Sequence, residues 1–140
     1  MKSEKNPQEL LMDLCRRDPR YPFEAYEFIF SALGYVQEKM IRERKKSPKD
    51  AAALPEQERH VTGQQLAEGC RDFALQEFGM MAGTVFRNWN IHKTDDIGEL
   101  VYNLIELKLL TKTDTDRKED FHNVYDMSTA FSTGFQFNLN

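Results

Sequence analysis

The stretch MMAGTVFRNWNIHKTDDIGELVYNLIELKLLTKTDTDRKEDFHNVY, residues 80–125, decides the fold class. A first apolar stripe ends near Trp89, and residues 94–96 (Thr-Asp-Asp) are typical of a helix start. The helix that follows carries apolar residues at helical spacing, namely Ile97, Leu100, Val101, Leu104 and Ile105. Two short apolar segments, 109–112 and 121–125, then flank a polar tip. The stretch therefore predicts two helices followed by a β-hairpin.

Around this unit we expect a mostly α, α+β protein with about five helices and a late β-hairpin. Residues 1–46 predict an N-terminal helical part, and residues 47–59, with two prolines and three alanines, an exposed loop. Residues 60–126 predict three helices and the hairpin, and residues 127–140 a docked tail. A chain of 140 residues is long enough for one well-packed core, so we expect a single domain, 1–140.

Local signals place several helix ends. Asn6 with Glu9, and Thr62 with Gln65, have the spacing of a capping box. Gly79 follows an apolar helical pattern, where a helix commonly ends in a left-handed residue. We expect helices to begin after Asn6 and Thr62 and one to end at Gly79.

The same periodicity predicts the core. Five residues on apolar stripes are expected to be buried, namely Phe30, Phe73, Trp89, Val101 and Leu104. Gly34 interrupts the second helix, and close packing of a neighbouring helix is the simplest compensation for its low helix propensity. Cys70 lies on an apolar stripe, so we expect a buried thiol and not a reactive one.

Composition excludes several classes of protein. The chain is 40% hydrophobic and 30% charged with a net charge of −4, which is ordinary for a globular protein and gives no overall attraction to nucleic acid. Two cysteines are too few for a disulfide scaffold. No signal peptide or stretch of membrane-spanning length is present. We therefore expect a cytoplasmic protein that does not associate with a membrane.

One strongly basic run stands out in this mildly acidic chain. Residues 39–49 contain six basic residues and a single acidic one, Glu43. Such a run can contact phosphate or an acidic protein, although lysine and arginine are also common near the end of a helix. With the basic pair in the polar tip, the candidate contact residues are Lys39, Arg42, Arg44, Lys45, Lys46, Arg117 and Lys118.

No residue set has the spacing of a known catalytic, cofactor or metal motif. The three histidines, His60, His92 and His122, form no metal-binding pattern; we expect His60 to support the cap before Thr62 and His122 to lie on a strand. Residues 114–120 are acidic but lack the glycine of a calcium loop, which predicts a solvated tip. We expect no catalytic residues, no cofactor and no metal. A pocket with convergent ionisable groups of shifted pKa would instead favour an enzyme.

Several segments resemble a conserved, uncharacterised bacterial protein family: residues 18–28, 60–66, 74–79, 89, 95–106 and 119–121. The similarity covers nearly the whole chain. It implies no activity, because no function is assigned to the family, and it supports residues 1–126 as one unit.

Residues 80–125 are also similar in architecture to winged-helix transcription regulators. In that class a basic residue at the wing tip touches the DNA backbone, which points to Arg117 and Lys118. The helix that would enter the major groove departs from the pattern, because it carries Asp95, Asp96, Glu99 and Glu106 against a single basic residue, Lys108. Phosphate strands repel such a helix.

These observations favour a non-catalytic, cytoplasmic protein-binding adaptor or regulatory module with a protein partner of unknown identity. The first alternative is a winged-helix nucleic-acid-binding regulator. The second is an enzyme whose site is assembled from residues that no motif connects. The sequence does not define an oligomeric state.

Overall fold

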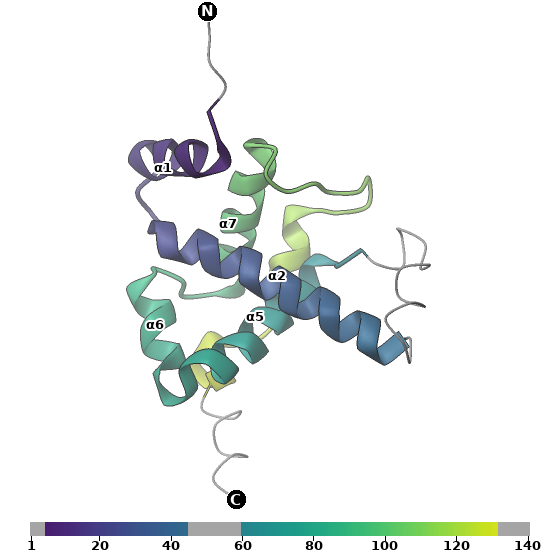
Figure 1. The fold of residues 1–140 in the computed structure, drawn as a ribbon. Coiled ribbons are helices and arrows are strands. Elements are labelled where there is room, and N and C mark those ends of the chain that lie inside the picture. Colours follow the sequence, from purple (N-terminus) through teal and green to yellow (C-terminus); the bar gives the residue numbers. More distant parts are fainter. Residues whose placement is uncertain (1–4, 45–59, 132–140) are drawn as a thin grey trace, which may run out of the picture.

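The long helix α2 (Phe23–Arg44) runs across the middle of the molecule, with α1 above it and α5 and α6 below in the view of Figure 1. The computed structural model describes residues 5–44 and 60–131. α2 contacts α1, α5 and α7. The other elements, in chain order, are α1 (Pro7–Arg17), α5 (Gly63–Phe78), η1 (Gly79–Met81), α6 (Ala82–Asn88), α7 (Thr94–Glu106) and η2 (Lys118–Phe121).

The predicted helix ends are confirmed. The Asn6 side chain accepts a hydrogen bond from the Glu9 N–H (2.8 Å), and the Glu9 carboxylate accepts one from the Asn6 N–H (3.0 Å). Thr62 and Gln65 make the same reciprocal pair at 3.1 and 2.9 Å. α5 ends at Gly79, whose φ is +53°. Each of these signals depends only on neighbouring residues, so the sequence suffices to find it.

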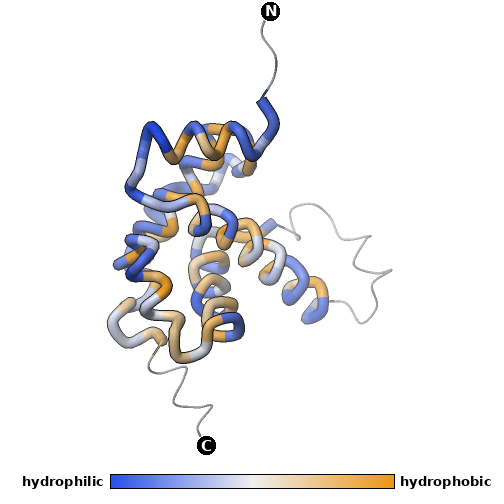
Figure 2. The backbone as a smooth tube through the Cα atoms, turned by 60° about the vertical axis from the view of Figure 1, so that its left-hand side comes forward, coloured by the Kyte–Doolittle hydropathy of each residue, from blue (hydrophilic) through white to orange (hydrophobic). Residues whose placement is uncertain are grey.

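An aromatic cluster joins α2, α5 and α6. The Phe28 ring lies 5.4–5.5 Å, between centroids, from those of Phe73, Phe86 and Trp89. Phe131, from a helical segment that begins at residue 127, packs edge-on against Phe86 at 5.0 Å. Hydrophobic and hydrophilic residues alternate along the chain trace in Figure 2, as expected for helices with one buried face.

The core prediction was partly wrong. Leu104, Val101 and Cys70 are buried, and Phe73 and Trp89 are partly buried against the core. Phe30, however, is 37% exposed. Ile29 is fully buried, and the next residue of a helix is rotated by about 100°, which turns Phe30 toward solvent.

The late β-hairpin and the winged-helix second half are wrong, because the described residues contain no β-strand. α7 ends in a Schellman motif instead. Leu109 N–H donates to the Leu104 carbonyl and Lys108 N–H to the Ile105 carbonyl, both at 2.9 Å, and Lys108 has a φ of +62°. The motif turns the chain out of the helix before a strand can begin.

The polar tip folds on itself. The Asp116 carboxylate accepts a hydrogen bond from the Thr113 N–H (2.8 Å), and the Asp120 carboxylate accepts one from the Arg117 N–H (3.0 Å). Aspartate bonds of this kind compete with a strand ladder for backbone N–H groups. The second bond starts the short helix η2 where the sequence predicted a hairpin.

Glycines let η2 approach the helices closely. A Cβ at Gly98 or Gly63 would lie 3.0 Å from atoms of Phe121, which is 3% exposed. Gly34, in contrast, has no atom within 4 Å of an ideal Cβ, so the close packing predicted there is wrong. Close packing between α2 and α5 occurs at Gly69, where an added Cβ would overlap Val36.

The two ends of the predicted domain plan are described only in part. Of the docked tail, residues 127–131 form helix and Phe131 is buried, whereas residues 132–140 lie outside the described residues. The predicted loop, 47–59, also lies outside them. None of the described helices combines the length and apolar composition needed to cross a bilayer.

Candidate binding pocket

A half-open pocket of about 150 Å³ lies between α2, the start of α5, α7 and the segment 110–121. Its apolar floor is formed by Leu33, Val61, Leu66, Val101, Ile105 and Phe121. A cavity of this size in another protein holds one benzene molecule. The pocket therefore fits a group of about six non-hydrogen atoms.

The His60 imidazole and the Asp116 carboxylate form a hydrogen-bonded pair in the wall of the pocket. The His60 Nε2 atom lies 2.9 Å from Asp116 Oδ2 and 3.0 Å from Oδ1. Asp116 Oδ2 also accepts the hydrogen bond from Thr113. Both oxygens of this carboxylate are thus already occupied by groups of the protein.

Tyr102, which lines the same pocket, has an unpaired hydroxyl. The hydroxyl oxygen is buried and has no hydrogen-bond partner among the described residues. Burial raises the pKa of Tyr102, and the negative charges of Asp116, Asp120 and Glu119 raise it further. The phenol consequently stays protonated at neutral pH and remains a donor without an acceptor.

Asp120 supplies an acceptor of complementary character. Its Oδ2 atom accepts the Arg117 N–H, and its Oδ1 atom accepts no hydrogen bond from the described residues. Asp120 lines the pocket, as do Tyr102 and Phe121. The polar lining of the pocket thus includes a buried donor, the Tyr102 hydroxyl, and a carboxylate oxygen, Asp120 Oδ1, that are not bonded to the described residues.

The shifted pKa values in the pocket do not suit acid–base catalysis. Burial alone would raise the pKa of Asp116, but the hydrogen bonds from Thr113 and His60 outweigh it and hold the pKa below its ordinary 3.8. The pKa of Tyr102 moves in the opposite direction, above its ordinary 10.0. A general acid or base works best with a pKa near the working pH, and both shifts lead away from neutrality.

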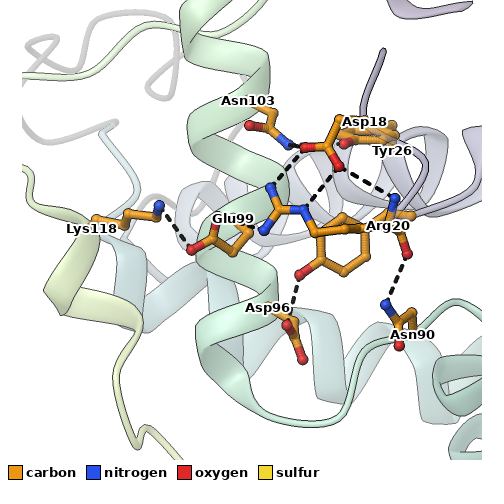
Figure 3. Close-up of polar contacts among 9 residues, drawn as sticks. Asp18, Arg20, Tyr26, Asn90, Asp96, Glu99, Asn103 and Lys118 are labelled. Atoms are coloured by element: carbon orange, nitrogen blue, oxygen red, sulfur yellow. Dashed lines mark hydrogen bonds and ion pairs between the residues drawn. The ribbon is translucent and has the colours of Figure 1, made fainter. Parts of the chain in front are cut away.

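A second polar cluster is centred on Arg20 in the turn between α1 and α2 (Figure 3). Its polar groups are bonded to one another, and we call it the closed cluster. The Arg20 guanidinium makes a two-point contact with Asp18, at 2.8 and 2.9 Å, and also bonds to Glu99 on α7 at 3.2 Å. Lys118 reaches the other oxygen of Glu99 at 2.8 Å. The Asn90 side chain donates to the Arg20 carbonyl at 3.0 Å. These bonds join the α1–α2 turn to α7 and to the loop that holds Asn90, and they join η2 to α7.

Tyrosines extend the closed cluster. Tyr21 donates its hydroxyl proton to Asp96 at 2.7 Å, and the Tyr26 hydroxyl accepts a bond from Asn103 at 3.0 Å. Arg20 holds the pKa of Asp18 below its ordinary value, and Lys118, with help from Arg20, does the same for Glu99. The cluster therefore contributes to stability only while its carboxylates are ionised.

Of the predicted contact residues whose side chains the structure describes, three pair with acidic side chains. Lys39 pairs with Asp72 and Arg42 with Glu38, each at 3.8 Å, while Lys118 pairs with Glu99. Arg117 is exposed at the rim of the pocket. Arg44 ends α2, its side chain is not described, and Lys45 and Lys46 lie outside the described residues. With the wing absent, Arg117 and Lys118 also lose their predicted role at a wing tip.

Sequence reasoning missed the residues that matter most in the pocket. His60 was expected to support a helix cap, and Asp116 and Asp120 to lie in a solvated tip. His122, expected on a strand, instead lies 3.0 Å from Asp95. His60 and Asp116 are 56 positions apart, and no spacing rule connects residues at that separation. The one available signal was the placement of aspartates three residues after Thr113 and Arg117, the spacing at which an acidic side chain reaches back to a backbone N–H in a capping box.

In the part of the chain that the structure describes, no group of three or more His, Cys, Asp or Glu side chains is placed to hold a metal ion. No protein-family model, curated protein or solved structure matches the chain. The inference of function therefore rests on the pocket itself.

Proposed function

We propose that the protein is a non-catalytic, cytoplasmic binding module, an adaptor or regulator whose pocket receives one anchoring group of a protein partner. The observation that supports this proposal is the buried Tyr102 hydroxyl without an acceptor. A buried donor left unpaired costs roughly 1–3 kcal/mol, and a ligand that supplies the acceptor recovers that cost.

The size of the pocket favours a side chain over a whole metabolite. Ligand pockets for small molecules usually measure about 300–1,000 Å³. A pocket of about 150 Å³ falls below that range. Protein partners, in contrast, commonly bind through a few side chains that enter well-packed pockets while the surrounding surface excludes water.

Affinity capture from native cytoplasm tests this proposal. The baits are the wild type, a Tyr102→Phe variant and a Tyr35→Phe control, since Tyr35 does not line this pocket. We expect a protein that is retained by the wild type and by the control and is lost from Tyr102→Phe. Equal capture by all three baits would contradict a role for the pocket.

An acid–base enzyme is the second candidate, and the observation that favours it is the His60–Asp116 pair in the pocket wall. Histidine is the most frequent general acid or base in enzymes. The binding proposal predicts that His60→Gln weakens partner capture only modestly. Turnover of a substrate that is abolished by His60→Gln with partner binding intact would favour the enzyme.

A further inference from the structure

We propose that the pocket recognises a neutral carboxamide on a short apolar stem, the chemistry of a glutamine side chain on the partner protein. This inference rests on the proposed function. It is drawn from the unused hydrogen-bonding atoms, the charges around them and the apolar floor.

The unused atoms define the head group. The buried Tyr102 hydroxyl lacks an acceptor, and Asp120 Oδ1 accepts no hydrogen bond from the described residues. A carboxamide presents a carbonyl acceptor and N–H donors on adjacent atoms, so one head group can satisfy both sides. An aliphatic group would leave the Tyr102 hydroxyl unpaired.

The surrounding charges disfavour ionic head groups. Asp116, Asp120 and Glu119 all act on the Tyr102 hydroxyl, as the direction of its pKa shift reflects. A carboxylate bonded to the Tyr102 hydroxyl would lie near the same three negative charges, and their repulsion opposes the attraction of Lys112 and Arg117, which also line the pocket. A cation would leave the Tyr102 donor without an acceptor, and it would also meet Lys112 and Arg117, which line the pocket. A neutral head group avoids both penalties.

The floor defines the stem. The apolar side chains beneath the polar rim include Leu66 from α5 and Val101 and Ile105 from α7. A glutamine side chain has about five non-hydrogen atoms beyond its Cα, close to the six of the benzene molecule that a cavity of equal volume holds. Its methylene groups can cover the floor while the carboxamide reaches the rim.

Three probes of nearly equal shape separate the possibilities: butyramide, butyrate and butyramidinium. Each is titrated into the full chain while backbone amide shifts are followed by NMR. We expect butyramide to shift amides of residues 60–66 and 101–121 with a millimolar Kd, and to bind about tenfold more tightly than either ion. Equal or tighter binding of an ion, or an absence of shifts in the pocket, would overturn the inference.

Two variants assign the contacts. Tyr102→Phe removes only the donor, and we expect butyramide to bind about fivefold more weakly, with Tyr35→Phe unchanged. Asp120→Asn keeps an acceptor but removes a charge. It should reduce the ratio of the Kd for butyrate to the Kd for butyramide. The Asp120→Asn result keeps the inference testable if Tyr102→Phe disturbs the fold. Unchanged affinity in Tyr102→Phe and unchanged selectivity in Asp120→Asn would both contradict the assignment.

A matched pair of blocked peptides, Gly-Gln-Gly and Gly-Glu-Gly, distinguishes a partner's side chain from a free amide. Binding of the glutamine peptide alone supports the inference; binding of butyramide without the peptide overturns the assignment to a partner's glutamine.

A failure of the proposed function would give a different result from a failure of this inference. If the probes are selective but capture from cytoplasm does not depend on Tyr102, the pocket chemistry stands and the adaptor function fails.

Discussion

Two polar regions meet on helix α7, and they differ in whether their polar groups have hydrogen-bond partners. One face of α7 carries Asp96, Glu99 and Asn103 into the closed cluster around Arg20, where each of them is bonded to a group of the α1–α2 region. The neighbouring face carries Tyr102 into the pocket, where its hydroxyl has no partner among the described residues. Both regions lie on one helix, so the backbone geometry of that helix does not explain why one set of polar groups is bonded and the other is not.

The contrast separates polar residues that hold the fold from polar residues that remain available for a ligand. In the closed cluster several bonds join segments more than 70 positions apart in the sequence, as in the Arg20–Glu99 and Tyr21–Asp96 pairs. Disturbing it should lower stability. Disturbing the unpaired groups of the pocket should change binding and leave stability nearly unchanged.

The largest effect is expected where the two regions share a support. Phe121 is 3% exposed, contacts α5 and α7 at Gly63 and Gly98, and forms part of the pocket floor. Phe121→Ala should lower the free energy of unfolding by roughly 3–5 kcal/mol, the usual cost of a truncated buried aromatic ring. Urea denaturation measures it, with Phe121→Leu as the milder comparison. An unchanged midpoint would show that η2 is not held by this ring.

The next largest loss of stability is expected from a substitution in the closed cluster. Arg20→Gln removes the two-point contact with Asp18 and the bond to Glu99. We expect a loss of roughly 1–3 kcal/mol, because bonds to ionised groups are stronger than neutral ones while the Arg20 side chain is partly exposed. Arg17→Gln is the matched control, since Arg17 is exposed and has no ion pair among the described residues. Equal effects of the two substitutions would contradict a structural role for Arg20.

Acid should weaken the same cluster. The folded state lowers the pKa values of Asp18 and Glu99 from their ordinary 3.8 and 4.5. A lowered pKa contributes stability that is fully present above the ordinary value and is lost as the pH falls through the folded value. Between pH of about 6 and about 3, the wild type should therefore lose more stability than Arg20→Gln. Urea denaturation at the two pH values gives the free energy of unfolding of both proteins. Equal losses in the wild type and in Arg20→Gln would argue against this linkage.

Gly34 on α2 and Gly69 on α5 differ in the space around them, and alanine substitutions there should have smaller effects of opposite sign. Gly34→Ala enters open space and should raise the free energy of unfolding by about 0.5–1 kcal/mol. Gly69→Ala would overlap Val36 and should lower it by roughly 1–3 kcal/mol. Thermal or urea denaturation compares the two variants with the wild type. A stabilising Gly69→Ala would show that α2 and α5 separate without cost.

The parts of the fold that were predicted correctly depend on local physics. The capping boxes at Asn6 and Thr62 and the helix end at Gly79 involve residues close in sequence. The hairpin was predicted from two apolar segments around a polar tip, a pattern that does not reveal whether the segments pair. Lys108 in a left-handed conformation and the carboxylates of Asp116 and Asp120 decided the outcome, and lysine is not a residue that signals such a turn.

The candidate site was less predictable than the fold. Its parts come from α2, the start of α5, α7 and the segment 110–121, so only the tertiary structure unites them. Arg117 was a predicted contact residue and does reach the pocket rim, but for a reason unrelated to a wing. Tyr102 could not be singled out, because an unpaired hydroxyl is a property of the folded surroundings and not of a motif.

One pair of identical substitutions tests the central contrast most directly. Tyr21→Phe removes a hydroxyl that donates to Asp96 at 2.7 Å, whereas Tyr102→Phe removes a buried hydroxyl that has no partner among the described residues. We predict that Tyr21→Phe lowers the free energy of unfolding by roughly 1–3 kcal/mol, while Tyr102→Phe leaves it unchanged or raises it slightly. Urea denaturation of the two variants beside the wild type gives the comparison. A loss for Tyr102→Phe equal to or larger than that for Tyr21→Phe would contradict the account.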